Sequence, residues 1–212
     1  MGSTDIEPDP EMLALAGDQV ELDPVDRLRS LLDHRGPACR QALETIADLR
    51  VNCVLVGPVA AALRGGPQRP GNGRVDVLVT PEDAEAAFKR LLDSGAWPDG
   101  VEASPNDQPR RERWRVGDGV LTLRVAAEAD ALRARARPVP LEGDESRALH
   151  VPLVEDLLAL AEHSPWSEDR VYLLGLRAVL ASHRDSSRTA RQTSASSMLT
   201  HLAEPEPPRL VV

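Results

Sequence analysis

The hydrophobic pattern in the middle of the chain predicts two strands that enclose a short helix. Residues 51–56 are mostly β-branched and apolar, which favours a strand, and they end at Gly57 and Pro58. Glycine permits a tight turn, and proline fits the first turn of a helix, where its missing N–H costs nothing. A small-residue helix therefore follows over residues 58–63. Residues 74–79 alternate at first and then become continuously apolar, as in a strand buried on both faces.

The flanking sequence predicts further helices and a hairpin. Thr80 is placed as an N-cap, with Pro81 in the first turn and Asp83 at capping-box distance, so a helix should run to about residue 94. Asp118 and Gly119 are a strong hairpin-turn signal. The other predicted elements are helices at residues 25–33, 37–50, 154–163 and 168–182, an edge strand at 101–103, and hairpin strands at 113–116 and 120–125. Together they predict an α/β (α+β) fold, a mixed sheet with flanking helices and a C-terminal helical segment.

The two ends of the chain differ from this central part. Residues 1–24 are acidic and polar without the pattern of a secretory signal, and the chain from residue 184 onward is rich in Ser, Thr, Arg and Pro. We therefore expect disordered tails at residues 1–24 and 184–212 around one domain at residues 25–183. No run approaches the roughly 20 apolar residues that span a bilayer. Since the two cysteines form no disulfide framework or C-x-x-C motif, we expect a cytoplasmic protein.

Composition limits the choice of partners. The formal net charge of -9 argues against nonspecific binding to nucleic acid, which depends on a basic face. A local basic patch at Arg110, Arg111, Arg113 and Arg115 surrounds Trp114. Strand alternation places Arg113 and Arg115 on one face and Trp114 on the other. We therefore expect Trp114 in the core and the arginines in solvent, and nucleic acid is an unlikely partner.

The order of strand, glycine turn, short helix, loop and Asp-bearing strand resembles the nucleotidyltransferase superfamily, in particular its small bacterial abortive-infection and antitoxin-associated members. In that family the first strand ends in a Gly-Gly or Gly-Ser turn that holds the triphosphate, and the next strand carries Asp-x-Asp, which binds magnesium. Gly57 matches the turn, Arg69 matches an arginine before the acidic strand, and Asp76 matches the second aspartate. The resemblance covers about residues 26–183. It implies magnesium as the cofactor and a nucleoside triphosphate as the ligand.

Several positions depart from that family's pattern. Pro58 replaces the second small residue of the turn and removes an N–H that could meet a phosphate. Arg74 replaces the first aspartate, which reverses the charge there. The third carboxylate belongs on a later strand, and residues 120–125 offer only Thr122 and Arg124 toward the cleft. Because hard magnesium ions need clustered oxygen ligands, we expect two of the three metal-binding carboxylates to be missing.

The leading interpretation is a nucleotidyltransferase-like pseudoenzyme. It would bind a nucleotide or a protein partner through the remnant cleft, with Gly57, Arg69 and Arg74 as nucleotide-binding residues. The resemblance leaves Asp76 as the only candidate for a catalytic and metal-binding position.

Two alternatives stay open. The first is an active magnesium-dependent nucleotidyltransferase that moves a nucleoside monophosphate from a nucleoside triphosphate to an unknown acceptor. It would require Asp76 to be joined by acids further along the chain, such as Glu128 or Asp130. The second is a protein-interaction module that binds no nucleotide. In that case Gly57 is only a turn residue and Asp76 only a salt-bridged strand acid.

Overall fold

The structure is a computed structural model of the 212-residue chain. It describes residues 23–66, 74–102, 110–164 and 172–184. The chain divides into two compact units, Met1–Val179 and Leu180–Val212. Of the second unit only residues 180–184 are described, and they are helical. The predicted tails lie almost entirely outside the described residues.

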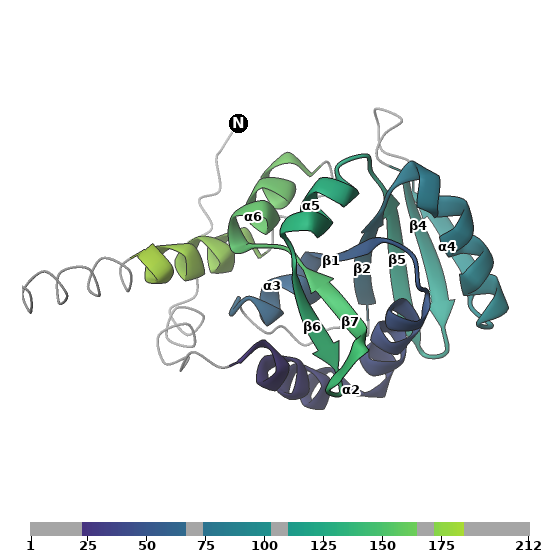
Figure 1. Ribbon diagram of the computed structural model, residues 1–212, viewed down its shortest axis with the longest axis horizontal. Coiled ribbons are helices and arrows are strands. Elements are labelled where there is room, and N and C mark those ends of the chain that lie inside the picture. The colour runs from purple at the N-terminus through teal and green to yellow at the C-terminus, as the bar shows by residue number, and fades with distance from the viewer. Residues whose placement is uncertain (1–22, 67–73, 103–109, 165–171, 185–212) are drawn as a thin grey trace, which may run out of the picture. The chain divides into compact units, whose positions relative to one another are not determined.

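A five-stranded mixed sheet forms the centre of the first unit (Figure 1). Its strands in chain order are β1 (Cys53–Val56), β2 (Arg74–Val79), β3 (Trp97–Glu102), β4 (Arg110–Val116) and β5 (Gly119–Val125). They are arranged as β1-β2-β5-β4-β3, with β2 and β5 parallel and all other neighbours antiparallel. The predicted α/β fold with a mixed sheet and flanking helices is confirmed.

Helices lie on both faces of this sheet. They are α2 (Pro24–Asp48), α3 (Gly57–Leu63), α4 (Pro81–Asp93), α5 (Ala129–Arg135) and α6 (Val154–His163). Phe88 of α4 stacks on Trp114 at a centroid distance of 5.8 Å. Leu132 of α5 instead clusters with Leu78, on the opposite face of the sheet. In Figure 1, α4 lies next to β4, whereas α5 and α6 lie together near β1.

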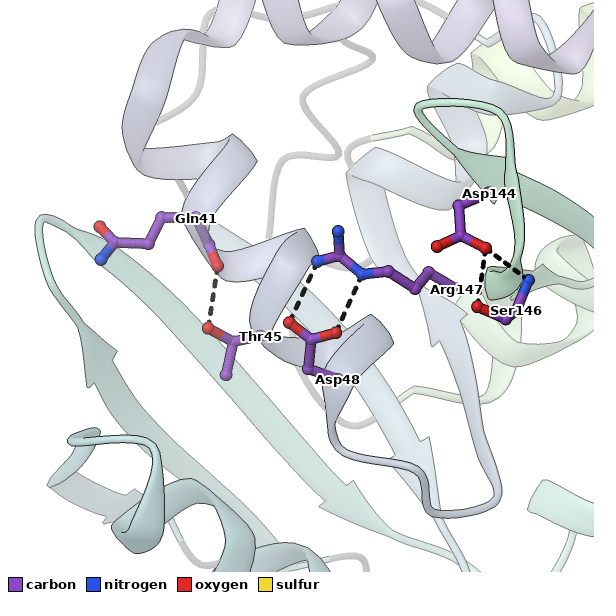
Figure 2. A network of polar contacts seen from close by, with 6 residues as sticks. All are labelled: Gln41, Thr45, Asp48, Asp144, Ser146 and Arg147. Atoms are coloured by element: carbon purple, nitrogen blue, oxygen red, sulfur yellow. Dashed lines mark hydrogen bonds and ion pairs between the residues drawn. The ribbon is translucent and has the colours of Figure 1, made fainter.

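A second, two-stranded sheet was not predicted. It pairs β6 (Arg137–Leu141) with β7 (Asp144–Val151). Two prolines in β6 and several charged residues in β7 hide the alternating pattern of a strand. β7 is tied to α2 by Arg147, whose Nε and Nη2 donate to the two carboxylate oxygens of Asp48 at 2.9 and 3.0 Å (Figure 2).

The remaining helices match the predictions except in detail. α2 consists of two helices that meet at Gly36, whose φ of 74° and ψ of -173° are not helical, so the two predicted helices are confirmed. α6 has the predicted bounds, and the cap of α4 is confirmed because Asp83 N donates to Thr80 Oγ1 at 3.1 Å. The predicted helix at 168–182 begins outside the described residues, and residues 173–184 are helical. β3 begins at Trp97, four residues before the predicted edge strand.

The predicted core position of Trp114 is confirmed, since only 4% of the residue is exposed. The low aromatic content leaves most of the core to aliphatic side chains, such as Leu121, Leu123 and Val77. Among the described helices, none is both long and apolar enough to cross a membrane.

Candidate functional site

The carboxylate of Asp76 is buried in the middle of the sheet between two guanidinium groups. Its side chain has no exposed surface. Arg74, two residues earlier on the same face of β2, donates from Nε to Oδ1 at 2.8 Å and from Nη2 to Oδ2 at 3.3 Å. Arg124 of the parallel strand β5 places Nη2 3.5 Å from Oδ2. Both carboxylate oxygens therefore already face a cation.

Strand register brings further arginines to this face. Asp76 pairs with Thr122, which pairs with Arg113 on β4. Two residues further along β5, on the same face, Arg124 pairs with Arg111 of β4. We call Arg74, Arg111, Arg113 and Arg124 the arginine cluster. Arg111 is fully buried, Arg124 is 7% exposed, and Arg74 and Arg113 are half-buried. The prediction that the arginines around Trp114 lie in solvent is therefore wrong for Arg111, and Arg113 and Arg115 are only partly exposed.

These residues do not fit a magnesium ion. The positions at which the sequence resemblance leads one to expect metal-binding acids hold Arg74, Asp76 and, on β5, Thr122 or Arg124. Magnesium prefers several oxygen ligands, whereas the guanidinium groups here supply positive charge at the same place. Across the described ranges, no group of three or more His, Cys, Asp or Glu side chains is placed to hold a metal ion. Of the acids that the enzyme alternative names as examples, Asp130 is exposed in the first turn of α5, whereas Glu128, the exposed N-cap of that helix, lines the same cavity as Gly57 and Arg124.

Gly57 lies directly against this carboxylate. Its φ is +72°, and a Cβ built there would lie 2.5 Å from Oδ2 of Asp76. Positive φ and close approach both favour glycine. Pro58 follows in the first turn of α3, as predicted. The packing against Asp76 therefore gives Gly57 a structural role that does not depend on phosphate binding.

A cavity of about 470 Å³ opens beside Gly57 and Arg124, and we call it the Arg124 cavity. Most of its wall is apolar and comes from the sheet, α5, α6 and the segment after α6. Its wall includes the side chains of Arg124, Arg135, Leu157, Leu160 and Tyr172, together with Gly57. Arg135 pairs with Asp156, which also lines the cavity, through contacts of 2.7 and 3.3 Å. The cavity thus combines apolar walls with a guanidinium that belongs to the arginine cluster.

Arg64 fixes the chain that leads into α6. Its guanidinium donates from Nε to the carbonyl oxygen of Pro152 at 2.6 Å and from Nη2 to that of Val151. Burial, together with the positive charges of Arg137 and Arg27, lowers the pKa of Arg64 to about 10. Arg64 therefore stays protonated at neutral pH and joins the end of α3 to the segment before α6.

The structure brings together three of the four residues proposed from the sequence. Gly57, Arg74 and Asp76 are adjacent, whereas Arg69 lies outside the described residues. Arg111 and Arg113 were not predicted to join them. Strand alternation placed Arg113 on the face opposite Trp114, but the order β2-β5-β4 was needed to bring Arg111 and Arg113 to Asp76.

Comparison with protein-family models and with curated proteins gives no match. Solved structures of ANT(2'')-Ia, an aminoglycoside nucleotidyltransferase, are similar to the chain. The solution structure of this antibiotic-resistance factor is 15% identical, covers 77% of this chain and 94% of its own, and has a TM-score of 0.42. The crystal structure with adenylyl-2''-tobramycin is 14% identical, covers 75% of this chain and 95% of its own, and has a TM-score of 0.43.

Proposed function

We propose that this chain is a nucleotidyltransferase-like protein that does not carry out two-metal transfer and binds a nucleotide without magnesium. The proposal rests mainly on Arg124, which both contacts Asp76 and lines the cavity. Its guanidinium pairs with Asp76, and its side chain also lines the Arg124 cavity. The same residue therefore neutralises the one remaining acid of the family's metal site and presents positive charge to a ligand.

Charge explains why metal would not be needed. Magnesium ions in phosphoryl and nucleotidyl transfer neutralise phosphate oxygens and bring the reacting groups together. A guanidinium also neutralises phosphate and can bind it through two hydrogen bonds. It does not lower the pKa of an attacking hydroxyl as a bound metal can. Because Arg74 already donates to both oxygens of Asp76, that carboxylate is also a poor general base.

The cavity favours a small ligand over a protein segment. Its volume of about 470 Å³ lies within the usual range of small-molecule sites. Leu157, Leu160 and Tyr172 give it the apolar walls that a nucleobase needs, and Arg124 supplies a partner for phosphate. A nucleotide has both parts that this cavity can bind, an apolar base for the leucines and Tyr172 and a phosphate for Arg124.

Calorimetric titration with each nucleoside triphosphate, in EDTA and in magnesium, tests the proposal. We expect binding of at least one nucleotide in EDTA. Arg124→Gln should weaken it roughly 10-fold to 100-fold, because a hydrogen bond to a charged group contributes about 1.5–3 kcal/mol. Arg29→Gln is the charge-matched control, since its side chain is 73% exposed on α2. Circular dichroism and a thermal melt would confirm that both variants fold.

Two outcomes would contradict the proposal. Binding that occurs only with magnesium would favour the active nucleotidyltransferase. Absence of binding at millimolar nucleotide would favour the protein-interaction module.

A further inference from the structure

A second cavity, of about 320 Å³, lies between α5, β7 and the segment that joins α2 to β1. The polar and ionisable residues of its wall include Arg50, Cys53, Arg133, Glu145, Ser146 and His150. None of its lining residues also lines the Arg124 cavity. It is therefore a separate site, and nothing in the proposed function uses it.

Arg133 and His150 are in direct contact in its wall. Nη2 of Arg133 lies 3.2 Å from Nε2 of His150. A guanidinium can only donate, so Nε2 must accept and the imidazole proton sits on Nδ1. Burial and the charge of Arg133 both lower the pKa of His150, which agrees with a neutral ring. The pair therefore carries one positive charge, on Arg133, and the neutral imidazole of His150 can bind one further proton.

Two acids lie near this pair in the described part of the chain: Glu145 lines the same wall, and the charge of Asp83 adds to burial in raising the pKa of Cys53. No carboxylate pairs with Arg133 there, and both Arg133 Nε and His150 Nδ1 are buried without a hydrogen-bond partner. Cys53 does not supply an anion either, because burial raises its pKa to about 11. A buried N–H without a hydrogen-bond partner is costly, so an anion that accepts from Arg133 Nε or His150 Nδ1 would be stabilising.

Two acids that lie near the lining residues in sequence, Asp48 and Asp144, already accept hydrogen bonds from residues other than Arg133 and His150. Figure 2 shows Asp48 paired with Arg147, and Asp144 accepting from the backbone N and the Oγ of Ser146 at 2.9 and 2.7 Å. Glu145 is the one acid among the lining residues, and it is exposed. Against it stand Arg50 and Arg133, which leave a positive balance before His150 titrates.

We propose that this second cavity binds a small oxyanion of the phosphate class, with Arg133 and His150 as its principal ligands. The guanidinium would bind the anion through its Nη donors. When the anion binds, His150 would take up a proton at Nε2, give up its contact with Arg133 there, and donate from the imidazolium to a second oxygen. Arg50, on the same wall, would add to the positive field. Binding at this site is independent of the Arg124 cavity.

NMR titration of the full chain with inorganic phosphate tests the proposal. The imidazole signal of His150 is assigned with His150→Gln and followed near pH 7. We expect a saturable shift toward the protonated form, and a higher pKa of His150 in phosphate than in chloride. Arg133→Gln should weaken phosphate binding at least about tenfold, and Arg133→Lys should weaken it less because the charge remains. Arg29→Gln should leave the titration unchanged.

Matched variants separate this site from the nucleotide site. Arg124→Gln should not alter the response of His150 to phosphate, and Arg133→Gln should not alter calorimetric binding of a nucleotide. The signals of the other histidines report whether each variant keeps its fold. Titration with phenyl phosphate then distinguishes a monoester ligand from free phosphate. A His150 signal that responds to pH but not to phosphate, or that responds equally in Arg133→Gln, would overturn the proposal.

Discussion

A Cβ atom at Gly57 would lie 2.5 Å from Oδ2 of Asp76, so the turn after β1 and the acid of β2 fit together only when residue 57 has no side chain. The same carboxylate accepts from Arg74 and faces Arg124. Asp76 therefore joins the turn, its own strand and the neighbouring strand β5. In this arrangement its first role is to hold the sheet and the arginine cluster together.

Replacement of Gly57 tests this packing. Gly57→Ala should lower the free energy of unfolding by roughly 2–5 kcal/mol, from about 1–2 kcal/mol for the left-handed backbone and about 1–3 kcal/mol for the collision. Gly95→Ala is the matched control, because its φ is +81° and a Cβ there meets nothing within 4 Å. It should cost only the backbone part. Equal losses for the two variants in urea unfolding would show that the contact with Asp76 is not tight.

The two arginines around Asp76 should act together. Arg74→Ala or Arg124→Ala alone leaves the buried carboxylate one guanidinium, whereas the double variant leaves it none. Loss of the last partner of a buried charge costs about 3–5 kcal/mol. We therefore expect the double variant to lose more free energy of unfolding than the sum of the single variants, as measured in a double-mutant cycle. Additive losses would mean that Asp76 gains little from either arginine.

His150 should make stability depend on pH. Its pKa is lowered in the folded chain, so the unfolded chain binds the proton more readily. The contribution of the neutral ring is fully present above the unfolded pKa of about 6.5 and is lost as the pH falls through the lower folded pKa. In phosphate-free buffer, the difference in unfolding free energy between the native chain and His150→Gln should be constant above pH ~6.5 and shrink below it. A difference that grows on acidification would contradict this sign.

Both thiols should resist modification in the native chain. Cys39 is buried, and burial raises the pKa of Cys53 to about 11, so little thiolate forms at neutral pH. Reaction with a disulfide reagent at pH 7.5 should be slow, and both cysteines should react once the chain is unfolded in guanidinium. Rapid reaction of one thiol in the folded chain would show that the wall around Cys53 opens.

Local signals predicted the elements that are continuous in sequence. β2 and α6 have the predicted bounds because the first alternates and then becomes continuously apolar, and the second begins with acids and leucines after a proline. β6 and β7 were missed because prolines and charges obscure their alternation, and their pairing is visible only in three dimensions. Sequence reasoning placed Arg74 and Asp76 on one strand, and it predicted the hairpin that joins β4 to β5. It could not place Arg111 in the same cluster as Asp76, since that also depends on β5 lying beside β2.

Calorimetry on Asp76→Asn tests the central claim most directly. Removal of the carboxylate charge removes a competitor of phosphate for Arg124, so the variant, once shown to fold, should bind the nucleotide in EDTA at least as tightly as the native chain. Magnesium should change neither protein's affinity to a large extent. Nucleotide binding that needs magnesium in the native chain and disappears in Asp76→Asn would contradict the account and identify Asp76 as a metal ligand.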